Sequence, residues 1–434
     1  MKEKQPKGQA RYLWPGLWAF SVALFTWLSL YNSHKAIVST TGIKSHRPSV
    51  QWARNDFNDP DDYLSASYVV DPSNNGTTAP QPVCLTQDCL VAVAQSIARS
   101  FPPRPRTSWC IPTAHRGQNS LIDQNNSQAW QGLLLVKVPK AASSTAAGLV
   151  LRMANRTGCA VQWEHREGHV YATRTKQSFL LGSVRQPAAR SLSSVWFFLL
   201  TPLNITPTDN NVIRSLHTRR CGKTKGKGGF QYNYLSLEAV APRSVWTPHA
   251  PTHVRDAPAL HARLQRLLQS YDFMLVVERM DESLTALAHL TGLSLKDVLV
   301  TNSKVAGSWL FKRVGRDSGT CQRQLKEPTS AGVQAYIESD EWVAMNYADE
   351  ILWRAANASL DRTIASIGHD TFAASLQEFR RLKEQVLQVC GSRLGFGCSD
   401  QGEPLADEQC YLRDFGCGYS CIDSVVDGNA VVVT

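Results

Sequence analysis

The chain has 434 residues, of which 43% are hydrophobic, and a formal net charge of +10. This hydrophobic content is normal for a globular protein, and the length accommodates one large domain with accessory segments. The basic balance favours an anionic partner, such as an acidic lipid surface or an anionic donor or acceptor. No nucleic-acid-binding module is recognisable, so we expect no nucleic acid partner. A basic surface without a role is the alternative.

The N-terminal segment predicts a membrane anchor. A nearly uncharged run of 20 residues extends from Tyr12 to Tyr31, which is long enough for a transmembrane helix. Basic residues precede it, at Lys2, Lys4, Lys7 and Arg11. Their position favours a cytosolic tail over residues 1–11, a single transmembrane helix over 12–31 and a lumenal remainder. A cleaved signal peptide is the competing interpretation.

Residues 32–128 predict a lumenal stem, because they are rich in Ser, Asn, Asp, Pro and Thr and show little periodicity. A short helix is expected near Leu90 to Arg99. The main domain is expected over residues 129–390, followed by a Cys-rich C-terminal appendage over 391–434. Within this domain we expect residues 201 to 231 to form a loop with many basic side chains.

The chain has 11 cysteines, which indicates an oxidising compartment and disulfide bonds. Because the count is odd, at least one thiol is free or pairs between chains, as in a homodimer. The sequence does not reveal the pairing. Glycosylation sequons, which a lumenal chain would expose to modification, occur at Asn75, Asn125, Asn155, Asn204 and Asn357.

A strand followed by a hydroxyl-rich turn is the most informative feature of the chain. The apolar run 133–138 predicts a buried strand, residues 139–145 (Pro-Lys-Ala-Ala-Ser-Ser-Thr) a turn, and 146–154 a helix. Amides at such a turn and the helix dipole favour a phosphate-like anion, and Lys140 adds a mobile charge. The spacing differs from that of a nucleotide triphosphatase loop. An ordinary turn with a serine helix cap is the alternative.

A second strand–turn–helix unit follows. Residues 178–184 predict another buried strand, and Arg185-Gln186-Pro187 begins a helical stretch that contains Arg190 and Ser193. The spacing of Arg185 and Ser193 allows a guanidinium and a hydroxyl to converge on one phosphate. With further strands at 273–277 and near Val161, the alternation predicts an α/β fold with a parallel sheet. Ligands of such sheets bind beyond the carboxyl ends of the strands, where both turns fall.

These motifs resemble those of Golgi carbohydrate sulfotransferases. Residues 138–145 and 184–193 resemble the 5′-phosphosulfate and 3′-phosphate sites of that family, although Gln186 replaces the usual Asp. Residues 273–284 and 352–360 resemble galactose 3-O-sulfotransferases, a family that includes galactosylceramide sulfotransferase, and the first turn also resembles heparan sulfate 2-O-sulfotransferases. The resemblance covers about residues 130–390. It implies a P-loop-like sulfotransferase fold, a Golgi location and 3′-phosphoadenosine 5′-phosphosulfate as the donor.

The resemblance also implies roles for individual residues. Lys140 would stabilise the leaving phosphate, and Arg185 and Ser193 would hold the 3′-phosphate. Either His169 or His165 would be the base. From the residues themselves, Glu278 and Asp281-Glu282 could bind acceptor hydroxyls, and Asp281 or Ser283 as a helix cap is the alternative. The 5′-phosphosulfate would be held by Lys140, Ala141, Ala142, Ser143, Ser144 and Thr145.

No metal-ligating pattern appears, so no metal is expected. The expected acceptor is a glycan on a glycolipid or glycoprotein, most simply the 3-hydroxyl of galactose. The alternatives are a 2-O-type polysaccharide sulfotransferase, a nucleotide kinase-like phosphotransferase and a membrane-anchored glycan-binding protein without activity.

Overall fold

The structure is a computed structural model, and all the residues that it describes belong to the unit Thr77–Thr434. It describes residues 85–112, 130–163, 167–220, 230–238, 257–300, 309–313, 319–323, 329–391, 398, 402–403 and 418–428. The expected cytosolic tail and transmembrane helix lie outside these ranges. Within them, no helix combines the length and the apolar character that a membrane crossing requires.

A four-stranded parallel sheet forms the centre of this unit, with the strand order β2–β1–β3–β4. Its strands are β1 (Gly132–Leu135), β2 (Val161–Gln162), β3 (Ser178–Val184) and β4 (Phe273–Val276). Every residue of β1, β3 and β4 is buried, as expected for parallel strands covered on both faces. The predicted α/β class and parallel sheet are confirmed, with strands at the four predicted places.

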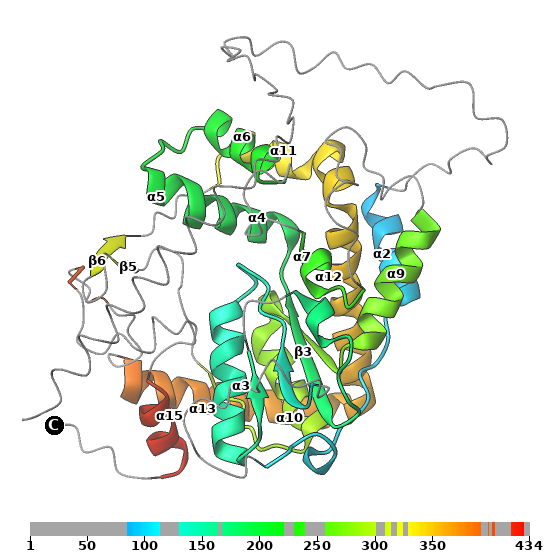
Figure 1. Cartoon of the computed structure of the whole chain (residues 1–434), viewed down its shortest axis with the longest axis vertical. Helices are drawn as coiled ribbons and strands as arrows, with labels where there is room; N and C mark the ends of the chain where they lie inside the picture. Colours follow the sequence, from blue (N-terminus) through cyan, green and yellow to red (C-terminus); the bar gives the residue numbers. More distant parts are fainter. Residues whose placement is uncertain are drawn as a thin grey trace, which may run out of the picture. The chain divides into compact units, whose positions relative to one another are not determined.

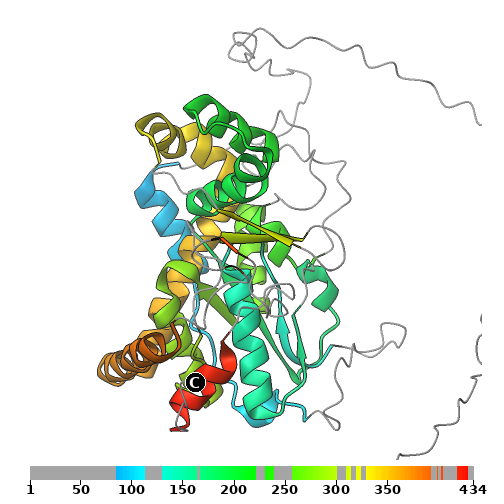
Figure 2. The same ribbon diagram turned by 90° about the vertical axis from the view of Figure 1, so that its left-hand side faces the viewer.

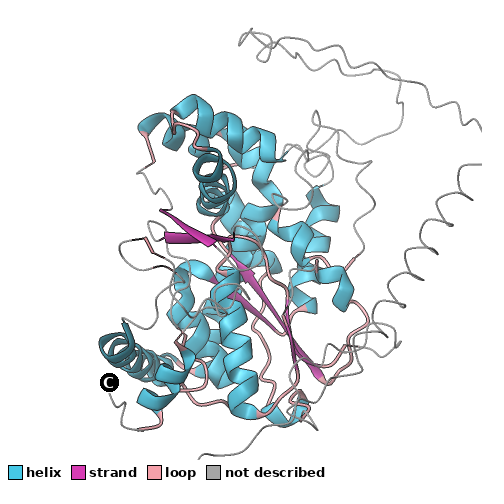
Figure 3. Cartoon of the chain, turned by 60° about the vertical axis from the view of Figure 1, so that its left-hand side comes forward, coloured by secondary structure: helices cyan, strands magenta, loops and turns pink. Residues whose placement is uncertain are grey.

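Helices cover the sheet. Helix α3 (Ser143–Thr157) packs on β1 and β2, whereas α12 (Asp340–Ile367) packs on β3 and β4 (Figure 1). Helix α10 (Met280–Thr291) follows β4 through the 3₁₀ turn η5 (Val277–Arg279) and contacts that strand. A two-stranded antiparallel pair, β5 (Trp309–Arg313) and β6 (Gly319–Arg323), is separate from the main sheet (Figure 3).

A group of helices lies beyond the carboxyl ends of the strands (Figures 1 and 2). Helix α4 (Pro187–Val195) continues through the π-helix η4 (Trp196–Leu200) into α5 (Thr201–Leu203). Helix α6 (Asp209–Arg220) contacts α4 and α11 (Ala331–Glu338). The loop predicted over residues 201–231 is therefore wrong in part, because Val212 and Leu216 are buried one helical turn apart and favour a helix there.

Part of the expected stem packs against the domain instead. Helix α2 (Gln87–Ile97) contacts α12 and α9 (Ala257–Ser270), and it buries Leu90 completely. Beyond the 3₁₀ turn η2 (Arg106–Ser108), a disulfide joins Cys110 to Cys159. The boundary expected near residue 129 therefore needs correction, because the apolar side of α2 requires a partner and finds it on α12.

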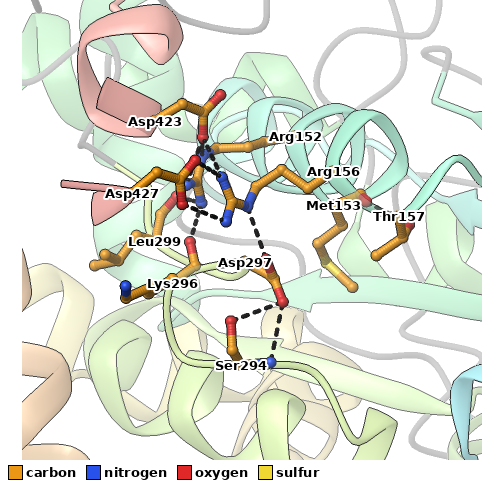
Figure 4. A network of polar contacts seen from close by, with 10 residues as sticks. All are labelled: Arg152, Met153, Arg156, Thr157, Ser294, Lys296, Asp297, Leu299, Asp423 and Asp427. Atoms are coloured by element: carbon orange, nitrogen blue, oxygen red, sulfur yellow. Dashed lines mark hydrogen bonds and ion pairs between the residues drawn. The ribbon is translucent and has the colours of Figure 1, made fainter. Parts of the chain in front are cut away.

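The C-terminal segment is attached by covalent and ionic contacts. Helix α15 (Tyr419–Val426) packs on α13 (His369–Cys390), to which a Cys390–Cys421 disulfide joins it. Another disulfide joins Cys321 of β6 to Cys398. These bonds agree with the predicted disulfides. Arginines of α3 contact carboxylates of this C-terminal segment and of the 294–299 turn (Figure 4).

Candidate functional site

The two predicted anion-binding turns lie side by side. Strands β1 and β3 are parallel neighbours, so the turns that follow them lie at the same edge of the sheet. Figure 1 shows the starts of α3 and α4 at this end. The Arg185 guanidinium donates from Nη1 to the Lys140 carbonyl oxygen at 3.2 Å. The second turn therefore contacts the first directly.

The first turn has an unusual backbone for its residue types. Lys140 has a φ of 65° and Ala142 a φ of 52°, both in the left-handed region. Each such non-glycine residue costs about 1–2 kcal/mol, and strain of this kind is concentrated at functional sites. The turn is held by Ser183 of β3, whose hydroxyl donates to the Ala141 carbonyl oxygen at 2.8 Å. The shape of the turn is thus imposed by its neighbours.

Helix α3 begins directly at this turn. Its N-cap is Ala142, which makes no side-chain hydrogen bond to the helix start. Ser143, Ser144 and Thr145 form the first turn of α3 and are all buried. Because an alanine cap offers no acceptor, the amides at this helix start depend on acceptors other than the N-cap side chain.

Lys140 points toward an aromatic ring. Its Nζ lies 3.7 Å from the centre of the Phe197 ring, on the π-helix η4. A ring face attracts an ammonium and holds the lysine side chain on one side of the turn. Short π-helical segments occur frequently at functional sites, because they displace side chains from the regular helix pattern. Here the segment supplies the aromatic partner of the lysine.

The second turn is supported by a glutamine and a glutamate. Gln186 caps α4, because its Oε1 accepts from the Ala189 amide at 2.6 Å. This position therefore supplies the helix cap of α4. Glu278 accepts from the Gln186 amide at 2.9 Å and from the Trp353 indole at 3.1 Å. Each oxygen of this carboxylate thus accepts a hydrogen bond from the protein. This favours a structural role for Glu278 over the expected contact with acceptor hydroxyls.

Among the described residues, no hydrogen bond joins Arg185 and Ser193. Burial lowers the pKa of Arg185, and nearby Glu278 opposes this effect. Ser193 is half-buried on α4. Arg190 of the same helix is instead buried beneath the first turn, and its Nε donates to the Pro139 carbonyl oxygen at 3.0 Å. The sequence does not predict this contact, because Arg190 and Pro139 are 51 residues apart.

The two candidate bases differ in what the structure describes. His165 lies outside the described residues. His169 belongs to the 3₁₀ turn η3 (Gly168–Tyr171), its side chain is 46% exposed, and its Nδ1 lies 3.4 Å from Glu167 Oε2. In a neutral imidazole, a proton on Nδ1 facing Glu167 would leave Nε2 as an acceptor. The exposed side chain of His169 is accessible from solvent.

Helix α7 (Gln231–Leu235) joins these parts, and the sequence analysis missed it. It contacts η3 and α12. Burial raises the pKa of its Tyr234, as does Glu167, while Arg190 opposes them. Tyr234 thus lies within electrostatic range of the residue beside His169 and of the arginine beneath the first turn. No sequence motif marks this five-residue helix, because its importance depends on contacts distant in the chain.

The arrangement suits an anionic ligand with more than one charge. Within the ranges that the structure describes, no group of three or more His, Cys, Asp or Glu side chains is placed to hold a metal ion. The site consists of two turns, each with one cationic side chain. The backbone of the first turn is strained, and the exposed His169 belongs to a third turn, η3. No family model, no curated protein and no solved structure matches this chain.

Proposed function

We propose that this protein is a carbohydrate sulfotransferase that uses 3′-phosphoadenosine 5′-phosphosulfate as its donor. The observation that carries this proposal is the direct contact between the two turns, in which Arg185 donates to the Lys140 carbonyl oxygen at 3.2 Å. Turns on adjacent parallel strands suit one ligand that carries anionic groups at both ends. The motif resemblance supplies the identity of that ligand.

The proposed reaction forms one bond and breaks another. The acceptor hydroxyl oxygen attacks the sulfur atom, the bond between sulfur and the bridging oxygen breaks, and adenosine 3′,5′-bisphosphate leaves. Lys140 stabilises the negative charge that develops on the bridging oxygen, and the helix start at residues 143–145 holds the phosphosulfate. Arg185 binds the 3′-phosphate, with Ser193 as its proposed companion.

The base takes the proton of the acceptor hydroxyl. His169 is the first candidate, because Glu167 lies beside its Nδ1 and leaves Nε2 to accept the proton. His165 is the second. The proposed acceptor is a glycan, most simply the 3-hydroxyl of a terminal galactose on a glycolipid or glycoprotein. The proposed location is the Golgi membrane, with residues 12–31 as the anchor and the domain in the lumen.

The test is transfer of radioactive sulfate by the full-length protein to a panel of galactose-terminated acceptors. We expect Lys140→Ala to abolish transfer while the protein remains folded, because the developing charge loses its cation. The matched control is Lys176→Ala, which removes an exposed lysine that precedes β3. Full transfer by the Lys140→Ala variant would remove this residue from the mechanism.

A second measurement separates the reaction classes. Adenosine 3′,5′-bisphosphate should raise the melting temperature of the protein in the presence of a metal chelator. A protein stabilised by ATP and magnesium but not by this nucleotide would be a kinase-like enzyme. A protein that binds glycans and neither nucleotide would be a glycan-binding protein.

A further inference from the structure

Gln231 of helix α7 makes hydrogen bonds to both the amide and the carbonyl oxygen of Arg185. Gln231 Oε1 accepts from the Arg185 amide at 2.8 Å, and Gln231 Nε2 donates to the Arg185 carbonyl oxygen at 2.7 Å. The glutamine is completely buried. A carboxamide accepts through its oxygen and donates through its nitrogen, so one side chain serves both main-chain groups. Gln231 therefore binds Arg185 as a neighbouring strand would, at the point where β3 has ended.

Helix α7 is itself fixed at both ends. Asp349 of α12, which is 2% exposed, accepts from the Gln231 amide at 2.9 Å and from the Tyr232 amide at 3.0 Å. These bonds satisfy donors that a helix start leaves without intrahelical partners. At the other end, the Tyr271 hydroxyl donates to the Leu235 carbonyl oxygen at 2.7 Å. The short helix is thus a rigid support rather than a surface turn.

The same carboxylate also supports the first turn. Burial lowers the pKa of Arg190, and Asp349 is the main charge that opposes this effect. Arg190 in turn donates to the Pro139 carbonyl oxygen at 3.0 Å. One buried carboxylate on α12 therefore stabilises the supports of both turns. The spacing between the Lys140 turn and Arg185 depends on these few buried polar contacts.

We propose that Gln231 is a positioning residue that sets the selectivity of the site for a nucleotide with a 3′-phosphate. It does so by fixing the main chain from which the Arg185 guanidinium projects. This inference rests on the proposed function, because the proposed role of Arg185 is to bind the 3′-phosphate. Charged hydrogen bonds to phosphate require exact alignment, and a small shift of the guanidinium weakens them steeply.

The experiment compares two nucleotides on the full-length protein by calorimetric titration. Adenosine 3′,5′-bisphosphate reports on both phosphate sites, whereas adenosine 5′-monophosphate reports on the first turn alone. We expect Gln231→Met, which keeps the length of the side chain but removes both hydrogen bonds, to weaken bisphosphate binding about tenfold, as loss of a charged contact does. Binding of the monophosphate should not change. The ratio of the two affinities is therefore the readout.

The matched control is Tyr271→Phe, which removes one buried hydrogen bond from the opposite end of α7. It should leave the affinity ratio unchanged, although it lowers stability. If Gln231→Met does not fold, Gln231→Asn replaces it, because it keeps a buried carboxamide but is one methylene too short to reach both main-chain groups of Arg185. An unchanged ratio in the folded Gln231 variant overturns the inference alone. A wild-type protein that does not distinguish the nucleotides overturns the proposed function as well.

Discussion

Replacing Arg152 by methionine should destabilise the place where α3 meets the 294–299 turn and the C-terminal helix. The Arg152 side chain is 1% exposed and donates to Asp423 Oδ1 from Nε at 3.0 Å and from Nη2 at 2.7 Å (Figure 4). Its Nη1 also donates to the carbonyl oxygens of Lys296 and Leu299. A methionine retains much of the apolar stem but none of these donors.

The free energy lost in Arg152→Met depends on which hydrogen-bond acceptors lose their donor. The Asp423 side chain is 38% exposed, so it can be hydrated again after the change and contributes little. The two carbonyl oxygens lie beside a buried side chain, and each costs about 1–3 kcal/mol when it loses its donor. We therefore expect Arg152→Met to lower the free energy of unfolding by about 3 kcal/mol, a large part of the stability of a typical domain.

Arg156→Met is the matched control. Arg156 lies one helical turn further along α3, and its side chain is 18% exposed. Its partners are carboxylates, which water can reach, so its loss should cost about 1 kcal/mol or less. Urea denaturation followed by circular dichroism measures both changes, and hydrogen exchange of residues 419–426 reports on α15 itself. Equal costs for the two variants, or a cost below 1 kcal/mol for Arg152→Met, would refute this reasoning.

Three further predictions follow from the same structure. Ala142→Gly should raise the free energy of unfolding by up to about 1 kcal/mol in urea denaturation, because glycine relieves the left-handed backbone, and a loss of stability would contradict the assigned strain. Hydrogen bonds from Arg156 lower the pKa of Asp427 below its usual 3.8. Burial raises the pKa of Asp297, but hydrogen bonds from Arg156 and Ser294 outweigh burial, so the pKa of Asp297 is lowered as well. The stabilisation from this pair of carboxylates is therefore present above about pH 4 and lost as the pH falls through their lowered pKa values, and urea titrations from about pH 2 to 5 should show a weaker acid dependence in Arg156→Met. Cys421→Ser opens a disulfide that spans 31 residues of sequence and should cost about 3.7 kcal/mol by the loop-entropy relation, whereas an unchanged urea midpoint would show that the bond constrains nothing.

The sequence predicted the sheet well because local signals dominate there. Residues 133–135 and 179–181 form continuous apolar runs between turn residues, and such runs are typical of strands buried on both faces. The two turns were predicted for the same reason, since each follows a strand end directly. The hydroxyl-rich start of α3 and Pro187 at the start of α4 are local signals as well.

The supports of the site could not be predicted, because their contacts are distant in sequence. Gln231 is separated by 46 residues from Arg185, and Asp349 by 118 residues from Gln231. No periodicity or composition distinguishes these residues from other glutamines and aspartates. The place of α2 was missed for a related reason: its flanking segments have the composition of a stem, and only its partner on α12 reveals that it belongs to the domain.

Calorimetric titration of the full-length protein without metal shows whether the two turns bind opposite ends of one adenosine nucleotide. Adenosine 3′,5′-bisphosphate should bind at least about tenfold more tightly than either adenosine 3′-monophosphate or adenosine 5′-monophosphate, because each turn contributes its own charged contacts. If the bisphosphate bound no more tightly than one monophosphate, one of the two turns would hold no phosphate, and the two-site binding proposed here would be wrong.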